Sequence, residues 1–163
     1  MTSSHFDLRI LMVCLGNICR SPMADGLLRR KVKEHDLNVL VDSAGTANYH
    51  IGSPPDHRMV EIATSRGTDI QDLRARQFSK IDFQDFDLIY VMDESNLTNV
   101  YRLASSEDER QKVRLILEDL YPKASMKVPD PYYGSMKDFM DVHDLLDEVT
   151  DVIIEKIKNG EIG

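Results

Sequence analysis

Apolar residues in this chain form two patterns, short and largely apolar runs and longer stretches with helical spacing. The short runs predict buried strands, and they cover residues 8–13, 39–41, 87–92 and 113–117. Apolar positions three or four residues apart predict amphipathic helices, and these cover residues 22–35, 56–66, 95–104 and 137–158. Because strands and helices alternate, we expect right-handed crossovers and a parallel sheet with helices on both faces.

The same spacing predicts which helix faces are buried. The inward positions are Ala24, Leu27, Leu28 and Val32 in the first helix, Leu97, Val100, Tyr101 and Ala104 in the third, and Phe139, Val142, Leu146, Val149, Ile153 and Ile157 in the last. Residues 48–55 and the polar run 105–110 are predicted to be loops, residues 74–80 have an irregular pattern, and a long loop passes through Pro122, Pro129 and Pro131.

These elements predict one α/β domain over residues 1–163, built on a four-stranded parallel twisted sheet of the flavodoxin or Rossmann type. Ligands of such sheets bind beyond the carboxyl ends of the strands. Cys14, Ser43, Asp93 and the loop with Asp130 each follow a predicted strand. We therefore expect these residues to lie together at one edge of the sheet.

Composition narrows the possible functions. A net charge of −8 and a pI near 5.1 argue against a nucleic-acid partner. The sequence has neither a signal peptide nor an apolar run of about 20 residues, which predicts a soluble cytoplasmic protein without a membrane partner. Two cysteines exclude a disulfide scaffold and a four-cysteine zinc site, and the scattered histidines, His50 and His57 among them, give no reason to assign a metal.

The stretch from Val13 to Pro22 predicts an anion site beside Cys14. Ser21 is a favourable N-cap and Pro22 a favourable first helical residue, so we expect a helix to begin there. Loop N–H groups and the helix N-terminus would then point at an anion of phosphate or sulfate size. Arg20 adds a planar fork of donors, and the positive surroundings favour a reactive thiolate.

Three further residues are candidates for supporting chemistry. Asn17 tolerates the left-handed backbone that a loop of inward N–H groups needs. Asp130, between Pro129 and Pro131, is either a general acid or an ordinary Asp-Pro turn, and the residues alone do not decide. Cys19 is either a small packed side chain or a thiol that traps oxidised Cys14 as a reversible disulfide.

Motifs along nearly the whole chain resemble those of the low-molecular-weight protein tyrosine phosphatases. The signature Cys-x5-Arg-Ser occupies residues 14–21, between a predicted strand and a predicted helix. The further blocks, in the family's order, are Asp42-Ser43-Ala44-Gly45, Tyr49-His50-x-Gly52-x-Pro54-x-Asp56-x-Arg58, Ala75-Arg76-Gln77, Met92-Asp93-Glu94-Ser95-Asn96 and Asp130-Pro131-Tyr132-Tyr133.

The resemblance implies a phosphotyrosine phosphatase that works without a cofactor, on a tyrosine-phosphorylated protein, as a monomer or weak homodimer. Cys14 would be the nucleophile that forms a phosphocysteine, Arg20 the phosphate clamp and Asp130 the general acid and then base. Ser21 would donate to the Cys14 thiolate, and Ser43 would hold Asn17. The residues implied to complete the phosphate loop are Leu15, Gly16, Ile18 and Cys19, and those implied to line the substrate cleft are Tyr49, Tyr132 and Tyr133.

One departure and three alternatives accompany this reading. Leu73 stands where many family members have a histidine behind the loop, so the network there must differ. A protein arginine phosphatase on the same fold tends to have a smaller polar residue at the position of Ile18. An arsenate reductase needs cysteines beyond Cys14 and Cys19, and a phosphate-binding module has no need of a proton donor such as Asp130.

Overall fold

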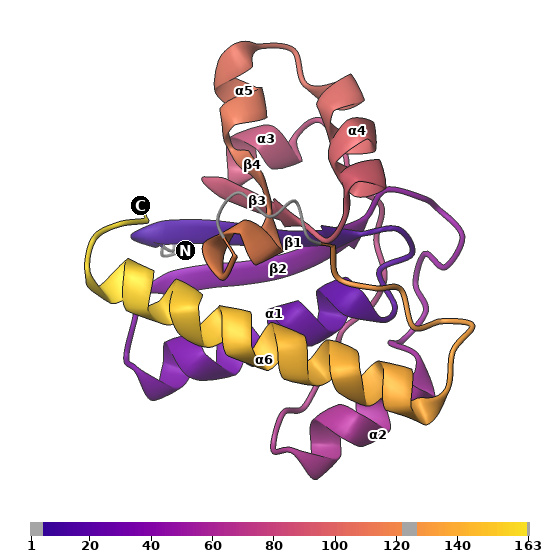
Figure 1. Ribbon diagram of the computed structural model, residues 1–163. Helices are drawn as coiled ribbons and strands as arrows, with labels where there is room; N and C mark the ends of the chain where they lie inside the picture. The colour runs from indigo at the N-terminus through magenta and orange to yellow at the C-terminus, as the bar shows by residue number, and fades with distance from the viewer. Residues whose placement is uncertain (1–4, 122–126, 163) are drawn as a thin grey trace.

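The computed structural model describes residues 5–121 and 127–162, and its centre is one parallel sheet (Figure 1). The strands are β1 (Leu8–Cys14), β2 (Val39–Gly45), β3 (Leu88–Val91) and β4 (Val113–Leu115). Their order is β2-β1-β3-β4, with every neighbouring pair parallel. The expected fold class is therefore confirmed, and the strand that delivers Cys14 is one of the two central strands.

Helices cover both faces of the sheet, as Figure 1 shows. On one face lie α1 (Arg20–Glu34), α2 (His57–Ser65) and α6 (Met136–Lys158). On the other lie α3 (Asp82–Asp85), α4 (Glu94–Leu103) and α5 (Glu107–Gln111). A short 3-10 helix, Ile116–Asp119, follows β4. Among the residues described, no helix combines the length and the apolar character needed to cross a membrane.

Each face of the sheet has its own hydrophobic core. The larger core joins β1 to α1, α2 and α6, and it buries the predicted inward residues of the first and last helices, with Ile157 partly buried. The smaller core lies under α3 and α4. Here one expectation is wrong, because Tyr101 is 37% exposed. The buried Asn96 takes a place on the inner face of α4 instead, where its Oδ1 accepts from Met92 N–H at 3.3 Å.

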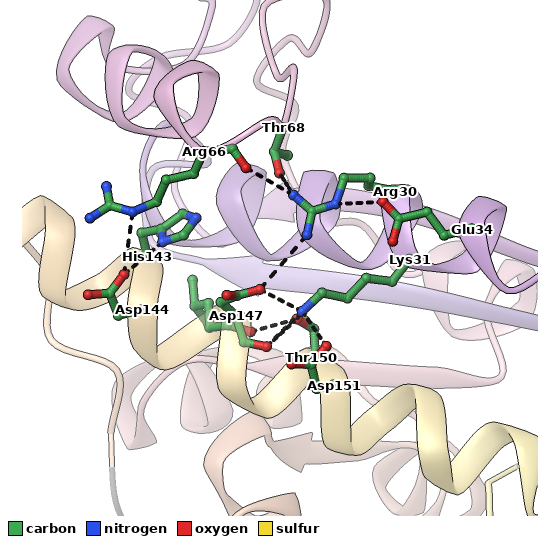
Figure 2. A network of polar contacts seen from close by, with 11 residues as sticks. Arg30, Lys31, Glu34, Arg66, Thr68, His143, Asp144, Asp147, Thr150 and Asp151 are labelled. Carbon is green, nitrogen blue, oxygen red and sulfur yellow. Dashed lines mark hydrogen bonds and ion pairs between the residues drawn. The ribbon is translucent and has the colours of Figure 1, made fainter.

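A buried polar network fixes α6 against α1 (Figure 2). The Lys31 side chain is only 4% exposed. Its ammonium donates to Thr150 Oγ1 at 2.7 Å and to both the carboxylate and the carbonyl of Asp147 at 2.7 Å. Its nitrogen also lies 2.9 Å from the Asp151 carboxylate. Because a buried ammonium needs such partners, the network fixes the register of the two helices. The chain segment before α6 is thereby anchored at one end.

Several predicted boundaries differ from the structure. β2 continues to Gly45, four residues further than expected for a strand ending at Val41. The polar run predicted as a loop contains most of α5, because Ser106 caps this helix by accepting from Glu109 N–H at 3.2 Å. Residues 116–117 belong to the 3-10 helix rather than to the last strand. Pro122, expected in a loop, lies outside the described residues.

Candidate active site

The loop after β1 wraps around the Cys14 sulfur. Asn17 has φ 58°, the left-handed conformation that its residue type suggested, and its N–H donates to Cys14 Sγ at 3.3 Å. The loop also packs on the end of β2, where a Cβ on Gly45 would lie 2.7 Å from the Leu15 carbonyl oxygen. Glycine at position 45 is therefore required for this close approach.

The expected start of the first helix is wrong. α1 begins at Arg20 with Cys19 as the N-cap residue, so Ser21 lies within the first turn. The Ser21 hydroxyl is turned inward, 3.0 Å from Cys14 Sγ, and it accepts from Asn17 Nδ2 at 2.8 Å. These two contacts occupy the hydroxyl and explain why it does not cap the helix. The expected proximity of Ser21 to the Cys14 sulfur is present.

A different partner from the expected one holds Asn17. Among the hydrogen bonds of the described residues, Asn17 Oδ1 accepts from Arg76 N–H at 3.0 Å, and none joins Asn17 to Ser43. Ser43 is buried and lies near Asp25 instead. Burial raises the pKa of the Asp25 carboxyl, and the Ser43 hydroxyl counters part of this rise. Leu73, at the position of the family histidine, packs against the larger core. The backbone N–H of Arg76 therefore supports the loop, and the residue type gave no indication of this role.

Arg76 is itself fixed by two carboxylates. Its guanidinium donates to both oxygens of Asp82, at 3.0 and 3.1 Å, and its Nε donates to Asp42 at 3.2 Å. Burial alone would lower the Arg76 pKa, but Asp82 and Asp42 outweigh this and hold the pKa above its ordinary value. The support behind Asn17 is therefore rigid and charged at neutral pH.

Arg20 lies under the loop with its side chain 3% exposed. It donates to Asp93 Oδ2 at 2.7 Å and to the Val128 carbonyl at 3.0 Å. Burial would lower the Arg20 pKa, but Cys14 and the hydrogen bond to Asp93 outweigh it, so the pKa lies above its ordinary value. Sequence reasoning placed Asp93 at this edge but gave it no role. The available signal was an aspartate directly after a buried strand.

Asp130 approaches the same space from the loop before α6. Its Oδ2 lies 3.6 Å from Arg20 Nη2, and its Oδ1 accepts from Tyr132 N–H at 3.2 Å. The side chain is 44% exposed, so it can exchange protons with solvent. Cys14, Arg20 and Asp130 therefore meet at one point, although they come from opposite ends of the chain.

A cavity of about 130 Å³ opens above these three groups. Its lining residues are Cys14, Leu15, Gly16, Ile18, Cys19, Arg20, Tyr49, His50, Asp130, Tyr132 and Tyr133. Tyr132 lies at the centre of the aromatic wall, with ring centroids 4.9 Å from Tyr133 and 6.1 Å from His50. His50 was not predicted to line the cleft, since an isolated loop histidine gives no such signal. The walls are suited to a flat ring with an anion at its base.

Cys19 lies in the wall of this cavity but differs chemically from Cys14. Both are thiols without a disulfide, and both are buried. Burial raises the Cys19 pKa far above its ordinary value, and the nearby Asp56 and Cys14 raise it further. Cys19 is therefore a neutral thiol in the wall of the same cavity as Cys14.

Comparisons with known proteins agree with this geometry. The family model for low molecular weight phosphotyrosine protein phosphatases matches residues 9–161. The protein of that name from Schizosaccharomyces pombe is 41% identical over 140 residues, covering 84% of this chain and 88% of the relative. The human protein of that name is 42% identical over 137 residues, covering 82% and 85%.

Two solved structures extend the likeness to three dimensions. A protein tyrosine phosphatase from Entamoeba histolytica, with Hepes in its active site, has a TM-score of 0.88 and 35% identity, covering 96% of this chain and all of that one. Wzb from Vibrio vulnificus, in complex with benzylphosphonate, has a TM-score of 0.82 and 29% identity, covering 91% and 98%.

Proposed function

Because the chain belongs to the low molecular weight phosphotyrosine protein phosphatase family, we propose that it hydrolyses phosphotyrosine through a phosphocysteine on Cys14. The observation that carries the assignment of residues is the meeting of three groups at one cavity. Cys14 Sγ accepts from a loop N–H, Arg20 lies beneath, and Asp130 lies 3.6 Å from Arg20. This set supplies a nucleophile, an anion clamp and a proton donor.

In the first step the Cys14 thiolate attacks phosphorus, so that an S–P bond forms as the P–O bond to the phenol breaks. The loop N–H groups and the Arg20 guanidinium hold the equatorial oxygens, whose charge is spread most widely in the transition state. Asp130, in its protonated form, gives its proton to the departing phenolate oxygen. The neighbouring Arg20 cation orients this carboxyl group towards the cavity.

In the second step a water molecule attacks phosphorus and the S–P bond breaks. Asp130, now a carboxylate, takes a proton from that water. Cys14 leaves as a thiolate, and the Ser21 hydroxyl at 3.0 Å and the Asn17 N–H at 3.3 Å stabilise its charge. The loop thus makes Cys14 both a nucleophile and a leaving group. Leu15, Gly16, Ile18 and Cys19 complete the loop.

The substrate we propose is a tyrosine-phosphorylated protein, with small aryl phosphates as weaker mimics. Tyr49, Tyr132 and Tyr133 border the cavity and suit a phenyl ring. Wzb from Vibrio vulnificus, which has the same fold, was solved in complex with benzylphosphonate, a compound with a phenyl ring. Ile18 keeps its wall apolar, which disfavours phosphoarginine. Arsenate reduction would need further cysteines, and Asp130 would be superfluous in a mere phosphate binder.

The setting we propose is the cytoplasm, with the chain acting as a single-domain monomer or weak homodimer. Two buried thiols without a disulfide suit a reducing compartment. The family match over residues 9–161 and the single sheet support one domain over 1–163. A net charge of −8 disfavours nucleic acid and anionic membrane surfaces as partners.

The test is the initial rate of phosphate release, measured in reductant without added metal. Phosphotyrosine, phosphoserine and phosphoarginine peptides are compared, with Cys14→Ser as the blank. Turnover of phosphotyrosine alone, lost in the variant, supports the proposal. Faster release from phosphoarginine would keep the mechanism and overturn the substrate, whereas tight phosphate binding without turnover would overturn the enzyme.

A further inference from the structure

Asp130 is the most exposed of the three groups proposed to carry the chemistry, and its loop has unusual anchors. Pro129 and Pro131 flank it, and neither has a backbone N–H to donate. The loop is therefore held from outside. At Val128, the N–H donates to the Met92 carbonyl at 2.9 Å, and the carbonyl accepts from Arg20 at 3.0 Å.

On the other side of Asp130 the anchor is Arg58, from the first turn of α2. Arg58 Nη2 donates to the Tyr132 carbonyl oxygen at 2.9 Å. The guanidinium carbon also lies 4.3 Å from the centroid of the Phe139 ring, so the group is packed between the loop and α6. Arg20 and Arg58 thus bind the loop carbonyls two residues before and two residues after Asp130.

Asp56 fixes the orientation of Arg58. The Asp56 carboxylate accepts from Arg58 Nε at 3.0 Å and from Nη2 at 2.9 Å, and its side chain is 8% exposed. Burial alone would raise the Asp56 pKa, but the hydrogen bonds from Arg58 outweigh it, so the pKa lies below its usual range. Asp56 N–H in turn donates to the Ile18 carbonyl of the phosphate loop at 2.8 Å.

A continuous chain of contacts therefore joins the phosphate loop to the carboxylate: Ile18 to Asp56, Asp56 to Arg58, Arg58 to Tyr132, and Tyr132 N–H to Asp130 Oδ1. We infer that Arg58, oriented by Asp56, is a positioning residue that sets the distance between Asp130 and the phosphate held in the loop. The inference rests on the proposed function, because it gives Arg58 a task only if Asp130 transfers protons.

Arg58→Met tests this, since methionine keeps a packed stem over Phe139 but has no N–H donors. The readout is kcat/KM for phenyl phosphate and for p-nitrophenyl phosphate, whose leaving group needs much less protonation. A misplaced acid is expected to lower kcat/KM for phenyl phosphate about tenfold to a hundredfold and to change that for the nitrophenyl ester little. Inhibition by inorganic phosphate is expected to stay at the wild-type value, because Arg20 and the phosphate loop are untouched.

Arg66→Met is the matched control, because Arg66 follows the same helix at its far end, away from the cavity. This variant is expected to change kcat/KM slightly, and by the same factor for both esters. Arg58→Lys keeps the positive charge and a group with N–H donors, so its selective loss is expected to be smaller. It replaces Arg58→Met should that variant unfold. An equal loss on both esters in the Arg58 variants, or a parallel loss of phosphate binding, would overturn the inference.

Asp130→Asn separates this inference from the proposed function. If that variant loses kcat/KM equally on both esters, the acid itself is misassigned. If its loss is larger for phenyl phosphate, Arg58→Met in the Asp130→Asn background is expected to add no further selective loss, because the acid is already absent. Full multiplication of the two selective effects would mean that Arg58 acts independently of Asp130, contrary to the inference.

Discussion

Arg20 Nη1 donates to Asp93 Oδ2 across 2.7 Å, and the other oxygen of the same carboxylate accepts from Asn96 N–H at 2.8 Å. Asp93 therefore does two things with one side chain. It orients the buried guanidinium below the phosphate loop, and it caps α4 directly after β3. Because Asp93 lies between β3 and α4, its ion pair fixes the Arg20 guanidinium relative to the sheet.

Replacing Asp93 is expected to damage activity more than its cap alone would. Asp93→Asn keeps an oxygen for Asn96 but turns a neutral amide towards Arg20, which leaves a buried charge without its ion pair. We expect kcat/KM for p-nitrophenyl phosphate to fall about a hundredfold. Ser106→Ala, which removes the cap of α5 far from the site, is the control for loss of a cap. Wild-type kinetics in Asp93→Asn would contradict the role given to this pair.

Ser21→Ala is expected to slow the second step of the reaction. The Ser21 hydroxyl lies 3.0 Å from Cys14 Sγ. In the proposed mechanism it stabilises the thiolate that leaves phosphorus. Hydrogen bonds to charged groups contribute about 1.5–3 kcal/mol, which predicts a fall in kcat of about tenfold to a hundredfold. Rapid mixing with p-nitrophenyl phosphate is expected to give a larger burst of nitrophenol in the variant than in wild type. Loss of the burst would place the effect in the first step instead.

Asp25 is expected to make stability depend on pH. Burial raises its pKa to about 6, against the lowering effect of Arg29. Since the folded protein holds this proton more tightly than the unfolded chain, the contribution of Asp25 is present below about pH 4 and is lost as pH rises through about 6. A shift of this size corresponds to about 3 kcal/mol.

Asp25→Asn is therefore expected to flatten the fall in unfolding free energy between about pH 4 and pH 6 and to stabilise the protein at pH 7. Urea titrations across that range measure the effect. Asp36→Asn, at an exposed position after α1, controls for the change of residue. If wild type and Asp25→Asn keep the same stability difference at every pH, Asp25 does not titrate as described.

Alkylation is expected to distinguish the two cysteines. Thiolates react with iodoacetamide and thiols hardly do, and the Cys19 pKa is raised strongly by burial, with Asp56 adding to it. Brief treatment at neutral pH is expected to label Cys14 and leave Cys19 unmodified, as peptide mass mapping would measure. Inorganic phosphate is expected to protect Cys14. Preferential labelling of Cys19 would reverse the proposed chemistry.

A reversible Cys14–Cys19 disulfide remains a prediction. Both thiols line the same cavity, and trapping oxidised Cys14 would keep it from irreversible acids. Mild peroxide is expected to lower the intact mass by two hydrogens and to abolish activity until reductant is added. The Cys19→Ala variant is expected to lose activity permanently under the same treatment. An unchanged intact mass would dismiss the switch.

Much of the arrangement around Cys14 could be predicted because it follows from chain topology. Strand ends of a parallel sheet lie at one edge, so Cys14, Ser43, Asp93 and the loop with Asp130 were expected to lie together there, and the left-handed Asn17 followed from its residue type. The start of α1 was not predictable in this way. Ser21 is an ideal cap by type, but its hydroxyl is engaged by Cys14 and Asn17, and tertiary contacts outweigh local preference.

The supports behind the site were the least predictable part. Arg76 holds Asn17 through its backbone N–H, a group that every residue but proline has, so the residue type carries no signal. Arg58 reaches the carbonyl of Tyr132 across 74 residues, and only folding brings the two together. The short α5 was missed because five residues are too few for a recognisable apolar period.

The contact between Arg20 and Val128 also has a consequence for how this protein folds. The contact from Arg20 to the Val128 carbonyl spans 108 residues, and the chain between them contributes β2, β3 and β4. Contacts of such long range close late and slowly, because the entropy of a large loop is lost before the contact forms. Recovery of catalysis during refolding should therefore lag behind the recovery of helical circular dichroism. Enzymatic turnover in this fold thus reports completion of the native topology, which spectroscopic helix content does not.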